Sequence, residues 1–243
     1  MQEILSIFYG WPPGLCRVEV IHISSAVERE PLVTELLAAL GPGATVREAA
    51  VPPPDAPRTC ALFIGEAEDG EQPSVAPRTL GEAGCLLSHV TACREALAAG
   101  AEVLALFEDD CRVSASLSAL RDWLHKVATA AAAFGLPPQP EILLLGTMGA
   151  YFALPWTPEA KLVERFNGSH ALVLTRPFME KVVAAYEMLL SRGLTAPVDG
   201  LYSALLRAER RWAICPIEDT AFFAQDRSIP SYVVGPDGTP TLR

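Results

Sequence analysis

The chain has 243 residues, half of them hydrophobic and a fifth charged, a composition typical of a globular protein with a buried core. A net charge of −10 without any block of Lys or Arg argues against a general nucleic-acid-binding protein. The apolar runs are shorter than the roughly 20 residues of a membrane span, and residues 1–15 lack the pattern of a signal peptide. We therefore expect a cytoplasmic protein with no nucleic-acid partner and no transmembrane segment, a location still compatible with peripheral membrane association.

Apolar segments alternate with helical patterns along the chain. In chain order we predict a strand at 18–23, a helix at 28–40, loops at 51–57 and 66–77, a helix at 81–99, a strand at 103–107, a helix at 117–134, a strand at 142–145, a loop around 151–156, a strand at 171–174, a helix at 177–190 and a late strand at 212–215. This alternation is typical of βαβ units. It predicts one α/β domain over residues 1–243, with a mostly parallel sheet, flanking helices and an irregular tail at 227–243.

Six scattered cysteines form no C-x-x-C pair, which argues against zinc-ribbon and thioredoxin-like proteins. In a chain of this length without a signal peptide, free buried thiols in a reducing compartment are the better interpretation.

The strongest local feature is an apolar strand that runs directly into Glu108, Asp109 and Asp110. Open α/β folds bind ligands at the carboxyl edge of the sheet. Because side chains alternate along an extended chain, Glu108 and Asp110 are expected to point one way and Asp109 the other. Two converging carboxylates repel each other unless a cation lies between them, and hard oxygen ligands suit Mg²⁺ or Mn²⁺. Alternatively, the three acids only cap or solvate a turn, and the cluster alone does not decide between the two.

A second segment, residues 79–89, reads T-L-G-E-A-G-C-L-L-S-H at the start of a predicted helix. Thr79 and Glu82 match a capping box, which explains Glu82 at least as well as a catalytic role does. Cys85, His89 and Cys93 fall on one stripe of the helix, so His89 is expected to point inward. An isolated inward histidine is more often a core residue than a ligand.

Two later segments carry further candidates. His170 lies directly before the strand at 171–174. One interpretation is that it faces a ligand pocket, where its imidazole suits a transition metal. The other is that it is bonded to a neighbouring carbonyl. Asp199 follows the helix at 177–190 and is either a functional acid or the N-cap of the next helix. The chain has no G-x-S-x-G, H-E-x-x-H or Gly-rich phosphate loop, so no motif supports a serine hydrolase, a zinc protease or a P-loop protein.

Taken in order, these segments resemble the glycosyltransferase family 25 domain, which includes bacterial lipopolysaccharide β-galactosyltransferases and collagen galactosyltransferase domains. The resemblance rests on T-x-G-E-x-G-C-x-L-S-H at 79–89, a strand ending in E-D-D at 108–110, G-[ST]-H-A at 168–171 and P-V-D at 197–199. A weaker likeness at 215–230 extends it over most of the chain.

The resemblance implies a GT-A-like, Rossmann-type nucleotide-sugar-binding fold. It also implies a hexosyltransferase that moves a hexose, with galactose expected, from a UDP-sugar to an acceptor hydroxyl with inversion, as in lipopolysaccharide biosynthesis. The expected partners are the UDP-hexose donor and a saccharide or other hydroxyl-bearing acceptor.

The same resemblance assigns roles to residues. Mn²⁺ or Mg²⁺ is expected at Glu108 and Asp110, with His170 completing the metal or phosphate site. Asp199 is the expected catalytic base and Glu82 the alternative base. Donor contacts are expected from Arg29, Arg78, Ser88, His89 and Asp109.

One departure concerns the first strand. Members of the family usually read I-N-L-x-R-S there, whereas this chain reads I-H-I-S-S at 21–25 and keeps only the following Glu28-Arg29 pair. The contacts of this loop with the nucleotide are therefore not assigned, and neither are the nucleobase and the sugar of the donor. The alternatives are a different sugar donor, a secondary-metabolite acceptor, or a catalytically silent scaffold that binds a sugar nucleotide.

The acceptor pocket is expected to be built from residues 146–158 and the region after Asp199. Tyr151, Phe152 and Trp156 either stack on a sugar face there or fill gaps in the core and loops.

Overall fold

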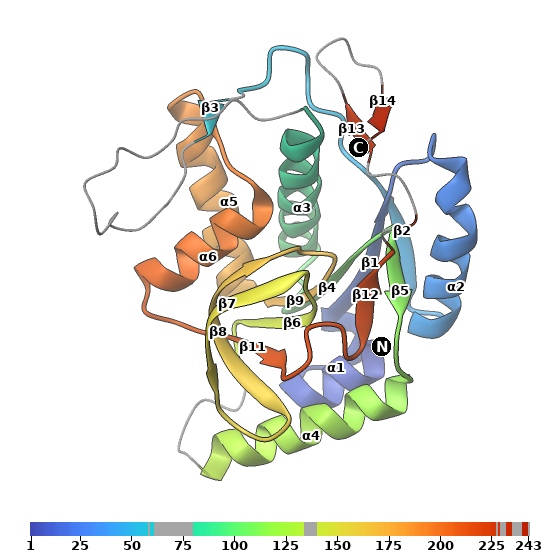
Figure 1. Cartoon of the computed structure of the whole chain (residues 1–243), viewed down its shortest axis with the longest axis vertical. Helices are drawn as coiled ribbons and strands as arrows, with labels where there is room; N and C mark the ends of the chain where they lie inside the picture. Colours follow the sequence, from blue (N-terminus) through green and yellow to red (C-terminus); the bar gives the residue numbers. More distant parts are fainter. Residues whose placement is uncertain are drawn as a thin grey trace.

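The computed structural model describes residues 1–57, 59–60, 80–133, 140–226, 228, 232–234 and 240–242. In these residues a large central sheet is covered by helices on both faces (Figure 1). The loop predicted at 66–77, together with Arg78 and Thr79, lies outside the described residues.

The central sheet has eight strands in the order β2-β1-β4-β9-β6-β11-β8-β7. The strands are β1 (Cys16–His22), β2 (Ala44–Glu48), β4 (Val103–Glu108), β6 (Ile142–Gly146), β7 (Gly149–Pro155), β8 (Ala160–Asn167), β9 (Ala171–Thr175) and β11 (Ala213–Pro216). β1 pairs in parallel with both β2 and β4, and β11 pairs in parallel with β6. The other pairings are antiparallel, so β8 and β9 run opposite to the remaining strands. The predicted α/β class is confirmed, with a mixed sheet.

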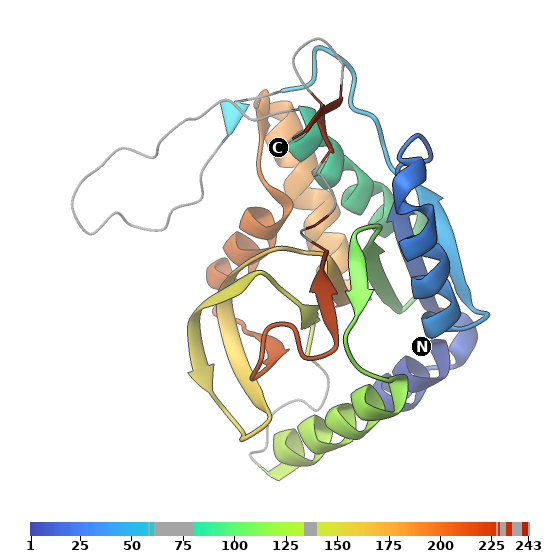
Figure 2. The same cartoon turned by 45° about the vertical axis from the view of Figure 1, so that its right-hand side comes forward.

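The helices divide between the two faces of the sheet. They are α1 (Gln2–Tyr9), α2 (Glu30–Leu40), α3 (Leu80–Ala98), α4 (Leu117–Ala133), α5 (Arg176–Ser191) and α6 (Val198–Ala208), with 3₁₀ turns η1 (Pro13–Leu15) and η2 (Val27–Arg29). One hydrophobic core joins α3, α5 and α6 to the sheet, and the other joins α1, α2 and α4 to its opposite face. Figure 2 shows the first group of helices packed together, and α1 beside α4 at one end of the molecule.

Strand β4 contributes to both cores because its side chains alternate between the two faces. Leu104 and Leu106 belong to the core beneath α3, and Val103, Ala105 and Phe107 belong to the opposite core. All five side chains are fully buried. A strand covered on both faces is uniformly apolar, which is why this segment is recognisable in the sequence.

In the segment 151–156, predicted as a loop, residues 151–155 instead belong to β7, which pairs with β8 in an antiparallel hairpin at the edge of the sheet. The prediction was wrong because this edge strand keeps much of its apolar surface exposed, so it lacks the usual alternation of buried and polar residues. Tyr151, Phe152 and Leu154 are all exposed.

Three short ladders complete the described structure: β3 (Thr59–Cys60) with β10 (Leu194–Thr195), β5 (Cys111–Val113) with β12 (Phe223–Gln225), and β13 (Tyr232–Val234) with β14 (Pro240–Leu242). The last ladder lies in the tail that was expected to be irregular. None of the described helices combines the length and the apolar character needed to cross a membrane.

Phe107 provides a test of how the core supports the end of β4. Its ring packs on Phe223, with 4.9 Å between the ring centroids, and is fully buried. We expect Phe107→Ala to lower the free energy of unfolding by about 3–5 kcal/mol because it leaves a cavity. Urea denaturation measures the loss. The same substitution at Phe152, which is 70% exposed, is the control and should change stability by less than about 0.5 kcal/mol. Equal effects at the two sites would contradict this account.

Candidate functional site

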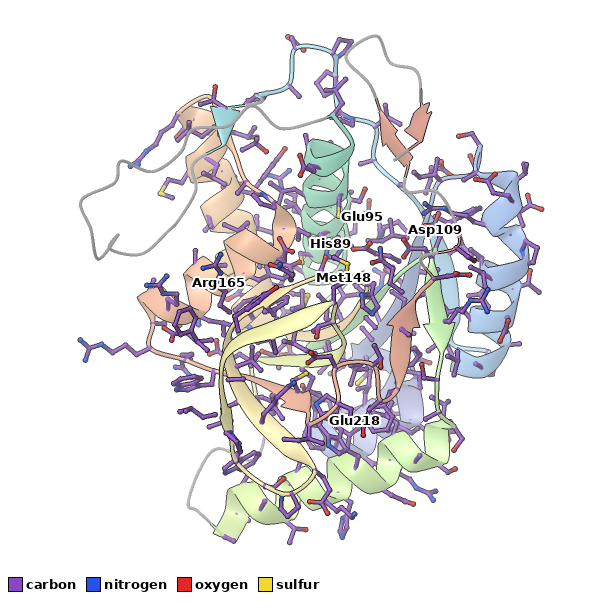
Figure 3. All side chains as sticks on the ribbon, in the orientation of Figure 1. His89, Glu95, Asp109, Met148, Arg165 and Glu218 are labelled. Atoms are coloured by element: carbon purple, nitrogen blue, oxygen red, sulfur yellow. The ribbon has the colours of Figure 1, made fainter. Side chains whose placement is uncertain are left out.

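The strand order reverses between β1 and β4. After β1 the chain adds β2 on one side of β1 and then returns to add β4 on the other side of β1. The two strands are parallel, so their carboxyl ends meet at the same edge, where open α/β sheets bind ligands. His22 ends β1 and Glu108 ends β4. In Figure 3, His89 and Asp109 lie in the middle of the molecule, whereas Glu218 lies apart from them, towards α4.

Asp109 connects these two strand ends. Its Oδ2 accepts a hydrogen bond from the Ile23 amide at 3.2 Å and lies 3.0 Å from His22 Nδ1, and its Oδ1 accepts a hydrogen bond from Arg29 Nη1. Asp109, His22 and Arg29 are all buried. The carboxylate therefore stabilises the first loop, and Arg29, predicted as a donor contact, is directed into the protein.

Glu108 points to the other face of the sheet, towards α3. Its Oε1 accepts a hydrogen bond from Ser169 Oγ at 3.0 Å and lies 3.4 Å from His89 Nε2 and 3.7 Å from Cys85 Sγ. Burial by itself would raise the pKa of this carboxyl. The hydrogen bond and charge of His89, the charge of His170 and the hydrogen bond from Ser169 outweigh burial and lower the pKa to about 2. Glu108 is therefore ionised at neutral pH.

Asp110 has a different environment because the chain turns directly after Glu108. Its Oδ2 accepts a hydrogen bond from Gln225 Nε2 at 3.0 Å, and its backbone oxygen accepts one from the Asp226 amide. Oδ1 is buried without a hydrogen-bond donor among the described residues. Burial, and next the charge of Glu108, raise the pKa of Asp110 to about 7. Glu108 and Asp110 thus interact electrostatically, although they contact different elements.

His89 is held in place by α6. Its Nδ1 lies 3.1 Å from the hydroxyl of Tyr202, and both side chains are fully buried. The ring is therefore oriented with Nε2 towards Glu108. His89 points inward, as its place on the helix stripe predicted, but it contacts a carboxylate instead of lying in a wholly apolar core.

Asp199 lies in the first turn of α6, where its Oδ1 accepts a hydrogen bond from the Gly200 amide and its Oδ2 accepts one from the Gly168 amide. The N-cap of α6 is Pro197 and has no side-chain capping bond, so the alternative prediction that Asp199 is the N-cap was wrong. The bond from Gly168 connects α6 to the segment that carries Ser169. Gly168 has a φ of +80°, and a Cβ there would lie 2.9 Å from Met148 atoms. Glycine is therefore required in the turn that presents its amide to Asp199.

His170 is buried beside Gly146. A Cβ added at Gly146 would lie 2.6 Å from His170 Nε2 and 2.4 Å from the backbone oxygen of Phe223. The absence of a side chain at Gly146 is what allows this histidine to reach the interior. Its charge acts on Glu108. Among the described residues, however, the ligand atoms of Glu108, Asp110 and His170 do not all lie within 4.8 Å of one another, so the predicted metal trio is not assembled.

The remaining candidates do not join this group in the described structure. Ser88 Oγ accepts a hydrogen bond from the Ala50 amide and donates one to the Gly84 carbonyl, so it connects α3 to the segment after β2. Glu82 is half-buried in the first turn of α3. Thr79, the other member of the predicted capping box, lies outside the described residues, as does Arg78.

Several residues of the site were not predicted to be functional. Cys85 and Tyr202 contact the carboxylate and histidine of the site, Ser169 donates to Glu108, and Gln225 donates to Asp110. The four-residue spacing of Cys85 and His89 on a helix was a usable signal, because such residues lie on one face. The sequence pointed to Gln225 only through the weaker likeness at 215–230, and its position beside Asp110 depends on the pairing of β12 with β5.

Comparison with models of known protein families gave no match, and comparison with curated proteins gave no significant match. The resemblance of the four stretches therefore stays a prediction, and the argument for a function depends on the geometry of the site.

Substitution of Arg29 tests the structural role of Asp109. Removing one partner of a buried ion pair leaves an uncompensated charge, so Arg29→Ala is expected to lower the free energy of unfolding by about 3–5 kcal/mol. Arg121→Ala is the control because Arg121 and its partner Asp122 are largely exposed, and it should cost less than about 1 kcal/mol. Chemical denaturation compares the two. A stable Arg29→Ala variant would show that Asp109 is not balanced by this arginine.

The raised pKa of Asp110 predicts how the stability of the protein depends on pH when divalent cations are absent. Below about pH 4 the carboxyl is protonated in both the folded and unfolded states. As pH rises to about 7 the unfolded state loses this proton first, so the folded state is progressively penalised. Asp110→Asn should therefore stabilise the protein at pH 8 by roughly 1–3 kcal/mol, and the gain should shrink towards pH 4. Thermal melts in EDTA, with Asp122→Asn as the exposed control, measure it. An equal gain at both pH values would contradict the assignment.

Proposed function

We propose that this chain is a glycosyltransferase that moves a hexose from a UDP-sugar to an acceptor hydroxyl with inversion. The observation that carries the proposal is the meeting of four segments that are far apart in the sequence. Glu108 accepts a hydrogen bond from Ser169 and lies beside His89, and the neighbouring Gly168 amide bonds to Asp199. These are the four stretches on which the family resemblance rests, so their contacts support it independently of their order in the chain.

The fold supports a nucleotide-sugar site of the GT-A, Rossmann-like type. The parallel strands β2, β1 and β4 with the reversal between β1 and β4 provide the edge at which such sheets bind nucleotides. The first loop after β1 is held in place by the buried Asp109.

A divalent cation fits the end of β4. Asp110 Oδ1 is a buried carboxylate oxygen to which no described residue donates a hydrogen bond, and the carboxyl lies close enough to Glu108 for that charge to act on it. Hard oxygen ligands of this kind suit Mg²⁺ or Mn²⁺. When bound, such an ion supplies Lewis-acid stabilisation of the leaving diphosphate. Asp110 and Glu108 would hold it, and His170 is buried nearby.

The chain's own residues supply the base. The acceptor hydroxyl attacks the anomeric carbon while the bond from that carbon to the UDP oxygen breaks, and the diphosphate takes the bonding electrons. The hydroxyl proton passes to a carboxylate within hydrogen-bond reach. We assign this role to Asp199, since each of its oxygens keeps a second lone pair besides the one used by Gly168 or Gly200. Glu82 is the alternative.

The edge hairpin of β7 and β8 fits an acceptor surface. Tyr151 and Phe152 are exposed by 49% and 70%, and Phe152 has a left-handed φ of 51°, which is strained for an aromatic residue. Met148, which precedes the hairpin, lies against Gly168, so this surface adjoins the segment bonded to Asp199. Aromatic faces of this kind stack on sugar rings, which supports a saccharide acceptor.

The decisive experiment measures UDP release from UDP-galactose, UDP-glucose and UDP-N-acetylglucosamine with a panel of saccharide acceptors, in Mn²⁺, Mg²⁺ or EDTA. We expect release from UDP-galactose only with a divalent cation, and its loss in Asp110→Asn. Asp199→Asn should lower turnover by about 10²–10⁴-fold while UDP binding, measured by calorimetry, is kept.

Asp122→Asn, on the exposed face of α4, is the control and should keep full activity. Release from another donor would change the assigned sugar, and release in EDTA would remove the metal from the proposal. Full turnover of Asp199→Asn would move the base elsewhere. No release from any donor, together with no UDP binding, would overturn the proposed function.

A further inference from the structure

Three side chains of different chemistry converge beneath α3. Cys85 and His89 are one helical turn apart, and Glu108 reaches them from the end of β4. One ligand atom from each, a thiol sulfur, an imidazole nitrogen and a carboxylate oxygen, lies within 4.8 Å of the other two. This group shares Glu108 with the hard-oxygen pair of Glu108 and Asp110 but adds a sulfur and a nitrogen ligand in place of Asp110.

Two of the three distances between these ligand atoms match the edges of a tetrahedral zinc site, and the third is below 4.8 Å. With Zn–S of about 2.3 Å and Zn–N and Zn–O of about 2.0–2.1 Å, a tetrahedron has S···O edges of about 3.6 Å and N···O edges of about 3.3–3.4 Å. Glu108 Oε1 lies 3.7 Å from Cys85 Sγ and 3.4 Å from His89 Nε2. These two edges therefore need only small adjustments to accept an ion.

The histidine has the supporting contact that zinc-binding histidines usually have. Its other nitrogen, Nδ1, lies 3.1 Å from the buried hydroxyl of Tyr202 on α6. A partner at the second nitrogen holds the ring orientation, and when the hydroxyl accepts a hydrogen bond from Nδ1–H, Nε2 can bind a metal. His89 itself is fully buried, so the ring is held in one place.

We propose that Cys85, His89 and Glu108 form a binding site for a thiophilic divalent cation, with Zn²⁺ as the expected ion. A sulfur, nitrogen and oxygen set favours zinc over magnesium or manganese. The charges of one thiolate and one carboxylate balance those of the ion, which matters at a buried position. Three protein ligands leave one coordination position for solvent or an anion, and 24% of the Glu108 side chain is exposed to admit it.

Cobalt substitution tests the site directly, because Co²⁺ bound to a thiolate gives a sulfur-to-cobalt charge-transfer band and intense visible bands when four-coordinate. The reduced wild-type protein, handled without oxygen or thiol reagents, is expected to bind one Co²⁺ with both signals. Addition of one equivalent of Zn²⁺ should displace it.

Three variants locate the ion. Cys85→Ser should remove the charge-transfer band, and Tyr202→Phe, which keeps the ring and removes only the hydroxyl, should weaken Zn²⁺ binding about 10–100-fold. Cys93→Ala is the matched control because Cys93 is a buried thiol about two turns after Cys85 along α3, and it should keep both the band and the affinity. Circular dichroism checks that each variant is folded.

The proposal is overturned if the folded wild-type protein gives no charge-transfer band, or if the band persists in Cys85→Ser or is lost in Cys93→Ala. Asp110→Asn separates this site from the proposed sugar transfer. It should keep the cobalt spectrum while losing metal-dependent UDP release, so failure of one hypothesis leaves the other measurable.

Discussion

The buried carboxylate of Asp109 holds the carboxyl ends of β1 and β4 together. It accepts hydrogen bonds from the Ile23 amide and from Arg29, and it contacts His22. The first loop of the sheet is thereby bound to the strand that carries the neighbouring acids. Because the partners come from a different part of the chain, the site edge can form only once both strands are paired. The positions of Glu108 and Asp110 depend on this arrangement.

Three consecutive acids lie at the end of β4, and each has a different set of ion-pair and hydrogen-bond partners. Asp109 is paired with an arginine, and Glu108 is stabilised in its ionised form by histidines and a hydroxyl. Asp110 has one side-chain donor in the part of the chain that the structure describes, Gln225, and its pKa is raised. An unbalanced buried carboxylate costs stability in the isolated protein, and such costs are concentrated at functional positions. Asp110 is therefore the residue at which a ligand cation would recover the most free energy.

The other side of the site depends on long-range packing. α3 and α6 belong to the same core, which brings Tyr202 within hydrogen-bond distance of His89. The left-handed turn at Gly168 presents an amide to Asp199 and leaves the following Ser169 against Glu108. Glu108 is thus the common partner of α3 and of the turn before β9. The same carboxylate is a ligand in the proposed donor site and in the proposed zinc site.

Much of the fold was predictable from local sequence. β4 is buried on both faces and therefore uniformly apolar, α5 carries an amphipathic stripe, and the acids at 108–110 follow directly from the end of a strand. The edge hairpin at 149–167 was not predictable, because an edge strand with exposed apolar residues lacks a clear period. Sequence by itself thus determined which residues carry charge and which elements bear them. Only the tertiary structure decided that Asp109 turns to Arg29, that Glu108 meets Cys85 and His89, and that Gln225 reaches Asp110. Those contacts join residues tens of positions apart, and strand order and helix packing, which local propensity does not encode, bring them together.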